Sequence, residues 1–315
     1  MYPLVLCAVA IAASLMLLYV GAKNTLQGAL WISRSLGVSR IITGCIFVAM
    51  VTALPELMSS LIAAIWQSSD LAFGNILGSN IYNIPLIIGL CGLVREFRIG
   101  NSIAEKESGF MIGLSAFLAL VLILTGAVTW WLGLIFLVMY PMFVYYSIRV
   151  FNTNNGLPNN REGGATRRKA AIYLVLGGMA LLSGTFLLVR SALYIVELYE
   201  VKEFYVGLTI MTLGSILPEL AVSLFAALEG EHEVSIGNVI GDNIVTITLV
   251  FGLVAVIHPF ETSALEVLST MPFMILVTVM LLAMSRGHRR VTRPLSLIML
   301  LVAVLSFIVQ TLLLT

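Results

Sequence analysis

Charged residues are scarce in this chain of 315 residues, where Asp, Glu, Lys and Arg together make up 10% and hydrophobic residues make up 60%. A soluble domain carries about 25% charged residues, so the composition excludes a soluble globular protein. The net charge of +1 gives no sign of a nucleic-acid partner, and no feature of the chain indicates an obligatory protein partner.

Cysteine is too rare for a disulfide framework. Cys7, Cys45 and Cys91 each lie inside an apolar run, and an odd count without a pairing pattern argues against bridges. We interpret them as small packing residues. The apolar N-terminus lacks a basic region and a clear cleavage site, so it is interpreted as the first membrane span and not as a removable signal peptide.

Long apolar runs are what the chain has in abundance. A transmembrane helix needs about 20 mostly apolar residues, and ten segments meet this requirement. The predicted spans are 3–22, 39–66, 71–93, 108–127, 129–149, 171–199, 204–228, 234–257, 264–285 and 294–314. The one long polar link is rich in Asn, Gly and Arg, which is typical of a linker. The sequence therefore predicts an all-α integral membrane protein with a first unit at 1–150, a cytoplasmic linker at 151–170 and a second unit at 171–315.

Lys and Arg are unevenly distributed among the links between these spans. The first, third, fifth and ninth links hold most of them, whereas the even-numbered links and both termini hold almost none. Cytoplasmic loops of membrane proteins carry an excess of Lys and Arg. We therefore expect a multi-pass protein of the plasma (cytoplasmic) membrane with its odd-numbered links in the cytoplasm and both termini outside.

The two halves of the chain carry the same pattern. A shift of 163 residues aligns the Leu-Pro-Glu-Leu sequence at 54–57 with the one at 217–220, and the Gly-Asn pair at 74–75 with the one at 237–238. Chance matching of apolar helices would not reproduce both pairs at one spacing. Because each unit has five spans, an odd number, the second copy enters the membrane from the opposite side. This predicts two inverted five-helix repeats, the layout of many secondary transporters.

A glutamate lies deep inside a predicted span in each repeat. Glu56 and Glu219 are too far from the span ends to reach the interface, and a carboxylate at this depth is costly unless it pairs or binds a cation. Pro55 and Pro218 precede these glutamates, and each predicts a kinked or opened helix at the midplane. The carbonyls that such openings would expose as oxygen ligands include those of Val51, Thr52, Met211 and Thr212.

Further polar side chains share a helix face with the glutamates. Thr52 and Ser215 each lie four residues before one of them, which is about one helical turn. In the next span of each repeat, segments 73–84 and 236–247 are rich in Gly and Asn, which predicts a second broken helix. The pairs that line one face there are Ser79 with Asn83, and Asp242 with Thr246. Four amides that either bond to freed backbone groups or act as ligands are Asn75, Asn80, Asn238 and Asn243.

These spans offer oxygen ligands only, because the three histidines fall in links or at span ends. Carboxylate, hydroxyl, amide and carbonyl oxygens suit hard cations such as Na⁺, Ca²⁺ or Mg²⁺ and disfavour zinc or copper. Two carboxylates favour Ca²⁺ over Mg²⁺, which loses its water reluctantly.

Other classes of function have less support in the sequence. No His-Glu-x-x-His or Gly-x-Ser-x-Gly motif of an enzyme occurs in the spans, and no cofactor site is predicted. A cation channel or a passive divalent-cation-binding membrane protein is the alternative to a carrier. A channel needs a continuous polar pore, however, and these spans are polar only around one depth.

The motifs resemble the alpha repeats of the cation/calcium antiporter superfamily, particularly its Na⁺/Ca²⁺ exchanger branch. The family's pattern is Gly-Thr-Ser-x-Pro-Glu followed by Gly-Asn-x-x-Gly-Ser-Asn, and here it appears as VTALPEL with GNILGSNIYN and as LGSILPEL with GNVIGDNIVT. The resemblance implies a secondary antiporter that exchanges Ca²⁺ for a monovalent cation, Na⁺ first, by alternating access. It also implies that the first and sixth helices, here 3–36 and 171–199, slide past a fixed core. The implied ion ligands are Glu56, Glu219, Thr52, Ser215, Ser79, Asn83, Asp242 and Thr246.

Four positions depart from the family's pattern. Ala53 and Ile216 replace serines that help to form Na⁺ sites in the family. Asp242 stands where a serine is expected and Thr246 where an acid or amide is usual, so the acid has moved by one helical turn. A third carboxylate close to two others favours proton binding, which makes H⁺ an alternative counter-ion to Na⁺.

Overall fold

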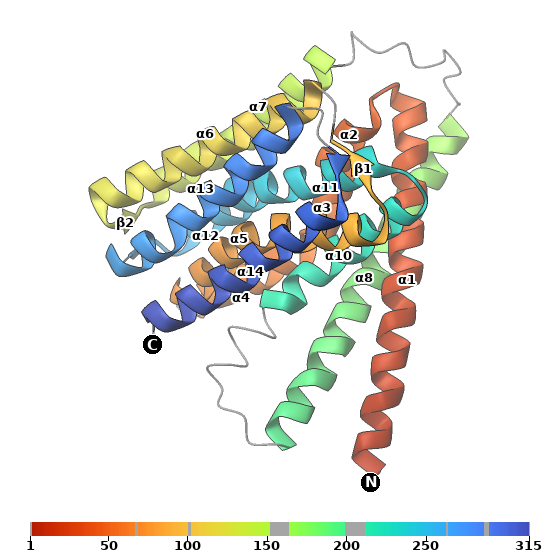
Figure 1. The fold of residues 1–315 in the computed structure, drawn as a ribbon, viewed down its shortest axis with the longest axis horizontal. Helices are drawn as coiled ribbons and strands as arrows, with labels where there is room; N and C mark the ends of the chain where they lie inside the picture. Colours follow the sequence, from red (N-terminus) through yellow and green to blue (C-terminus); the bar gives the residue numbers. More distant parts are fainter. Residues whose placement is uncertain are drawn as a thin grey trace.

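The computed structural model describes residues 2–66, 69–99, 102–151, 164–198, 212–262, 264–286 and 290–314, and most of them are helical (Figure 1). The first unit contains α1 (Tyr2–Leu36), α2 (Arg40–Thr43), the π-helical turn η1 (Gly44–Val48), α3 (Ala49–Thr52), α4 (Leu54–Ile65), α5 (Ser69–Val94), β1 (Phe97–Arg98), α6 (Ser102–Thr125), β2 (Ala127–Val128) and α7 (Trp130–Phe151). The second unit contains α8 (Gly164–Leu198), α10 (Thr212–Leu228), α11 (His232–Val245), the π-helical turn η3 (Thr246–Val250), α12 (Phe251–Ile257), β3 (Phe260–Glu261), α13 (Ala264–Arg286), β4 (Arg290–Val291) and α14 (Arg293–Leu314).

The helices account for the ten predicted spans. Eight of the described helices are long and apolar enough to cross a membrane, with α11, η3 and α12 forming one of them. The pair Arg40–Thr52 and Leu54–Ile65 is a broken span bent by 46°. α10 is the described part of the span predicted at 204–228, of which residues 204–211 lie outside the described ranges. The expected all-α integral membrane architecture is therefore confirmed.

The boundaries of the helices repeat with the same shift as the sequence motifs. Adding 163 to the bounds of α7 gives 293–314, which are the bounds of α14. The same shift takes α5 to 232–257, the range that α11, η3 and α12 cover together. The duplication that the motifs indicate thus extends to the ends of individual helices.

Two short pairs of strands show that the second unit is inverted. β1 pairs with β4 in the register Phe97 opposite Val291, and β2 pairs with β3 in the register Val128 opposite Phe260. The 163-residue shift converts one register into the other. Because β1 precedes and β2 follows the 24-residue helix α6, the two strand pairs lie at opposite ends of the bundle (Figure 1). Equivalent links of the two repeats therefore lie on opposite sides.

α1 and α8 pack side by side and run at a steep angle to α6, α13 and α14 (Figure 1). A Cβ atom added to Gly21 would lie 2.8 Å from the backbone nitrogen of Leu181, and one added to Gly184 would lie 3.0 Å from the carbonyl oxygen of Ser14. Glycine is needed at both positions because the two backbones approach so closely. α8 begins at Gly164, so the end of the segment predicted as a linker is helical.

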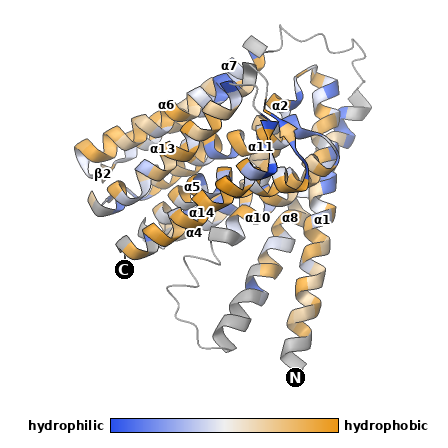
Figure 2. Cartoon of the chain, viewed as in Figure 1, coloured by the Kyte–Doolittle hydropathy of each residue, from blue (hydrophilic) through white to orange (hydrophobic). Residues whose placement is uncertain are grey.

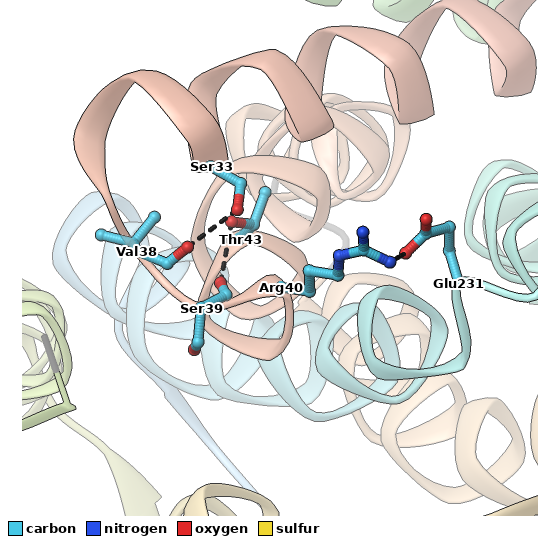
Figure 3. A network of polar contacts seen from close by, with 6 residues as sticks. All are labelled: Ser33, Val38, Ser39, Arg40, Thr43 and Glu231. Atoms are coloured by element: carbon cyan, nitrogen blue, oxygen red, sulfur yellow. Dashed lines mark hydrogen bonds and ion pairs between the residues drawn. The ribbon is translucent and has the colours of Figure 1, made fainter. Parts of the chain in front are cut away.

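A tight turn joins α1 to α2 and ties both to the second unit (Figure 3). Gly37 has a φ of 67°, a conformation that favours glycine. The Ser33 hydroxyl donates a hydrogen bond to the carbonyl oxygen of Val38 at 2.8 Å. Arg40, the first residue of α2, forms an ion pair with Glu231 in the link between α10 and α11. Hydrophilic residues gather at this end of the bundle, whereas the helices are apolar along most of their lengths (Figure 2).

The predicted second broken helix is wrong in both repeats. α5 is continuous through 73–84, and α11 continues through 236–245 into the π-helical turn η3. The amides of Asn80 and Asn243 each donate to the carbonyl oxygen four residues earlier, at 2.9 Å. These bonds form without opening the helix, and α5 stays helical even through Pro85, the residue that follows the first segment. In these two segments, asparagine serves hydrogen bonding by its side chain, and glycine in the second segment allows close packing of the backbone.

The two prolines before the glutamates have different effects. The helix breaks at Ala53, two residues before Pro55, as the sequence predicts. Pro218, in contrast, lies inside the continuous helix α10, so the opening predicted there is wrong within the described residues. A helix can lose one amide donor and continue when the neighbouring bonds hold. Met211, whose carbonyl was a candidate ligand, lies outside the described residues.

Candidate cation-binding site

Glu56 is fixed by the break in its helix. The carboxylate lies in the first turn of α4, where the partial positive charge of a helix N-terminus stabilises a negative group. The side chain is 1% exposed. The Ser79 hydroxyl of α5 donates to Glu56 Oε1, and the Thr246 hydroxyl of η3 donates to Oε2 at 2.8 Å. Glu56 therefore joins elements of both repeats.

Asp242 and Asn83 form a second contact between the repeats. The Asn83 amide of α5 donates to Asp242 Oδ2 of α11, and both side chains are buried. The shift of 163 residues relates Ser79 to Asp242 and Asn83 to Thr246. In each repeat-related pair, one residue therefore bonds to Glu56 (Ser79 or Thr246) and the other takes part in the Asn83–Asp242 contact.

Glu219 lies in the middle of α10 and is 1% exposed. Its carboxyl group lies near that of Asp242, and neither of its oxygens has a hydrogen-bond partner among the described residues. Two buried carboxylates that are both ionised repel each other, so either a cation or a proton at this place relieves the repulsion.

Several buried oxygens at this place accept no hydrogen bond from the described residues. They are Glu219 Oε1 and Oε2, Asp242 Oδ1, Asn83 Oδ1 and Asn243 Oδ1. All five are acceptors, and leaving a buried acceptor unsatisfied costs about 1–3 kcal/mol, with more for a charged group. A cation satisfies several such oxygens together, whereas a hydrogen-bond donor satisfies one.

A polar chain links Thr52 to the same region. The Thr52 hydroxyl approaches Asn238 Oδ1 at 3.1 Å, and it also lies 3.2 Å from the carbonyl oxygen of Val48. The Asn238 amide donates to the Ser223 hydroxyl at 2.9 Å and to the carbonyl oxygen of Glu219 at 3.3 Å. The hydrogen-bond partners of the Thr52 hydroxyl are therefore Asn238 and its own helix, and not the glutamate side chains. Ser215 is buried on α10, one turn before Glu219.

The four amides that the sequence left open divide into two kinds. Asn80 and Asn243 bond to their own helices, as described above. Asn75 donates to the Ser60 hydroxyl at 3.0 Å, which makes it a link within the first repeat, whereas Asn238 reaches Thr52 across the repeats. The bridging role of Asn238 and Ser223 was missed, because hydroxyls beyond the motif carry no distinctive spacing.

Close backbone packing brings α11 against the first repeat. A Cβ atom on Gly237 would overlap the carbonyl oxygen of Ile41, and one on Gly241 would overlap the backbone of Cys45. Asp242 follows Gly241 directly, so this approach sets the position of its carboxylate. Within the described ranges, no group of three or more His, Cys, Asp or Glu side chains is placed to hold one metal ion. A cation at this place needs hydroxyl and amide oxygens beside the carboxylates.

Comparison with known proteins identifies the family of the chain. A model of the sodium/calcium exchanger protein family matches residues 6–149 and 169–312, which are the two repeats. The chain belongs to the sodium/calcium exchanger family. It is therefore a transmembrane antiporter of a calcium-transporting family and not a member of an enzyme family.

Individual members of this family and their folds resemble the chain along most of its length. It is 33% identical over 285 residues to CaxA of Alkalimonas amylolytica, named as a candidate antiporter, with 87% of this chain and 88% of CaxA covered. It is 27% identical over 310 residues to the sodium/calcium exchanger MaX1 of Methanosarcina acetivorans, with 85% and 88% covered. Its fold matches a structure of the sodium-calcium exchanger NCX_Mj with a TM-score of 0.85 at 23% identity, over 96% of this chain and 98% of that one.

Proposed function

We propose that this antiporter exchanges Ca²⁺ for a monovalent cation at the site between α4, α5, α10 and α11. The proposed ion ligands are Glu56, Glu219, Thr52, Ser215, Ser79, Asn83, Asp242 and Thr246. The observation that carries the proposal is the set of buried oxygens without a donor, two of which belong to Glu219 and one to Asp242.

Calcium fits the chemistry of these oxygens. Ca²⁺ takes six to eight oxygen ligands in flexible geometry, including carboxylates that bind through one or both oxygens. Both oxygens of Glu56 already accept a hydrogen bond from a hydroxyl. Glu219 and Asp242 are the carboxylates with oxygens that no donor occupies. Ion binding there also relieves the repulsion between them.

Movement of α1 and α8 is our proposal for alternating access. These two helices share an apolar cluster that includes Leu18, Leu26 and Leu181 and that also contains residues of η1, α10 and α11. The contact between α1 and α8 is lined by glycines, so the two helices are closely packed and would move as one unit. The Gly37 turn joins α1 to α2, and this turn would take up the change in backbone direction when α1 moves.

The counter-ion is Na⁺ by family resemblance, with H⁺ as the alternative. The proximity of the Asp242 and Glu219 carboxyl groups supports the proton, because a proton on one of them removes the repulsion between two negative charges. Ala53 and Ile216 are buried beside this region and bring no hydroxyl, which reduces the oxygen ligands available to Na⁺.

We also propose that the end of the bundle with β1 and β4 faces the cytoplasm. Arg95 and Arg98 lie in the link that contains β1, and Arg290 and Arg293 lie in the link that contains β4. An excess of arginine marks cytoplasmic links. The protein would then be integral to the plasma (cytoplasmic) membrane, with both termini on the outer side.

The test is uptake of ⁴⁵Ca²⁺ by proteoliposomes under separately imposed gradients of Na⁺, K⁺ and H⁺, with the membrane potential clamped. An antiporter accumulates Ca²⁺ only when a counter-ion gradient points outward, and the effective gradient identifies the counter-ion. Equal Ca²⁺ flux without any counter-ion gradient would identify a channel and refute the proposal.

A further inference from the structure

A fourth buried carboxylate, Glu107, is not among the proposed ion ligands. Glu107 of α6 is 2% exposed, and its Oε1 accepts a hydrogen bond from the Ser147 hydroxyl of α7 at 2.8 Å. The ion pairs of the described residues involve other carboxylates and do not include Glu107. A carboxylate accepts about four hydrogen bonds, so the Ser147 donor leaves most of the hydrogen-bonding capacity of Glu107 unused.

Glu107 lines a crevice between α6 and α7 with a volume of about 460 Å³. That volume lies within the usual range of small-ligand sites, roughly 300–1,000 Å³. The lining residues are Lys106, Glu107, Phe110, Met142, Phe143 and Tyr146. The rings of Phe110 and Phe143 stack at 5.3 Å, and Met142 and Tyr146 are more than half exposed. The crevice therefore combines an acid, a base and an apolar wall.

The crevice lies near one end of the bundle. Glu107 is the sixth residue of α6, so about 8 Å of helix separates it from the start of α6. β1 precedes α6 directly, which places the crevice at the end of the bundle with the β1–β4 pair. A group bound there meets the headgroup region on one side and the acyl chains on the other.

The repeat shows that the fold does not require this acid. The shift of 163 residues relates Glu107 to Thr270, whose hydroxyl donates to its own helix at the carbonyl oxygen of Glu266. The same shift relates Phe143 to Ser306 and Tyr146 to Val309. Phe110 corresponds to Phe273, so the equivalent place beside α13 keeps one ring but lacks the acid and the stacked pair of rings. These two features therefore belong to one side of the membrane only.

We propose that this crevice binds an aminophospholipid, with its primary ammonium on Glu107, its phosphate near Lys106 and an acyl chain along Phe110 and Met142. A primary ammonium supplies three donors and one positive charge, which are what the Glu107 carboxylate lacks. The lysine ammonium also has three donors, so it can bind a phosphate in addition to its other contacts. The proposal does not depend on which ions the antiporter exchanges.

The test compares lipid headgroups on the delipidated full-length protein in detergent, by native mass spectrometry. The headgroups are phosphatidylethanolamine, its dimethyl derivative, phosphatidylcholine and phosphatidylglycerol with identical acyl chains. We expect binding to fall about tenfold from phosphatidylethanolamine to phosphatidylcholine, because methylation removes the charge-assisted donors. Equal or stronger binding of phosphatidylcholine or phosphatidylglycerol would overturn the proposal. This series uses wild-type protein only, so it tests the proposal even if a variant fails to fold.

Two variants locate the binding. Glu107→Gln is expected to abolish the preference for phosphatidylethanolamine, whereas Thr270→Val, the repeat-related control, is expected to keep it. Soluble phosphoethanolamine is expected not to compete, because it lacks the acyl chain. A preference that survives Glu107→Gln, or competition by phosphoethanolamine at equal concentration, would contradict this assignment.

Discussion

The two repeats contribute matching glutamates to the candidate site but hold them differently. Glu56 accepts hydrogen bonds from Ser79 and Thr246, whereas neither oxygen of Glu219 accepts one from the described residues. The second repeat also carries the additional acid, Asp242. The first repeat therefore provides a carboxylate that is already held in place, and the second provides carboxylates whose charge is left for a cation.

Removing either glutamate charge is expected to have the largest effect. Leaving a buried charge without its partner costs about 3–5 kcal/mol, so Glu56→Gln and Glu219→Gln should each reduce ⁴⁵Ca²⁺ transport more than about a hundredfold. Glu229→Gln, outside the spans, is the control. Transport at the wild-type rate in either variant, with normal insertion, would refute the site.

The same two variants should differ in cation-free stability. Glu219→Gln replaces a carboxylate without donors by an amide that can donate to Asp242, so the melting temperature should rise. Glu56→Gln disrupts two hydroxyl bonds and should lower it. Thermal unfolding in detergent with chelator measures both melting temperatures. Equal shifts in the two variants would contradict the proposed difference between the repeats.

The packing of the repeats differs at their equivalent glycines. Gly237→Ala places a Cβ against the carbonyl oxygen of Ile41, whereas the Cβ position of Gly74 has nothing within 4 Å. Overpacking typically costs about 1–3 kcal/mol, so Gly237→Ala should lower the melting temperature. Gly74→Ala should be neutral or stabilising, since alanine favours helix by about 0.5–1 kcal/mol. Matching melting temperatures for the two variants would show that α11 does not approach α2 this closely.

Asp242→Ser gives the second repeat the side chain that Ser79 gives the first. Because it removes the carboxyl partner of Glu219, we expect the ratio of H⁺-driven to Na⁺-driven Ca²⁺ uptake to fall about tenfold, the equivalent of one hydrogen bond to a charged group. Adding Ile216→Ser should raise Na⁺-driven uptake further. An unchanged ratio in the proteoliposome assay would rule out Asp242 as a determinant of the counter-ion.

The smallest expected difference is between the equivalent amides Asn238 and Asn75. Asn238→Ala removes contacts to Thr52 and Ser223 across the site, whereas Asn75→Ala removes contacts to serines of its own repeat. A hydrogen bond contributes about 1 kcal/mol, so Ca²⁺ affinity should fall about fivefold in Asn238→Ala and less in Asn75→Ala. Titration of Ca²⁺-dependent uptake checks the order, and a reversed order would contradict the bridging role of Asn238.

The spans and the repeat could be predicted because apolar length and a fixed spacing are properties of the chain itself. The break before Glu56 could be predicted from Pro55, since a proline removes a backbone donor wherever it lies. The continuity of α5 and α10 could not, because glycine, asparagine and even proline interrupt a helix only when tertiary contacts do not hold the neighbouring turns. The Gly-Asn segments show this clearly: the amides of Asn80 and Asn243 bond within their own helices, and Gly237 and Gly241 admit another backbone.

The site was predictable in residue type but not in pairing. The motifs identify the carboxylates and hydroxyls, but which oxygen meets which donor depends on how α5 and α11 approach each other. The sequence therefore could not show that the carboxylate of Glu56 accepts hydrogen bonds from side chains and that the carboxylate of Glu219 does not.

Equilibrium binding of ⁴⁵Ca²⁺ to the purified protein tests most directly whether the unbonded oxygens of the second repeat hold the ion. We predict saturable binding to the wild-type protein that is lost in Glu219→Gln and retained in Glu229→Gln. Wild-type binding by folded Glu219→Gln protein would contradict the account.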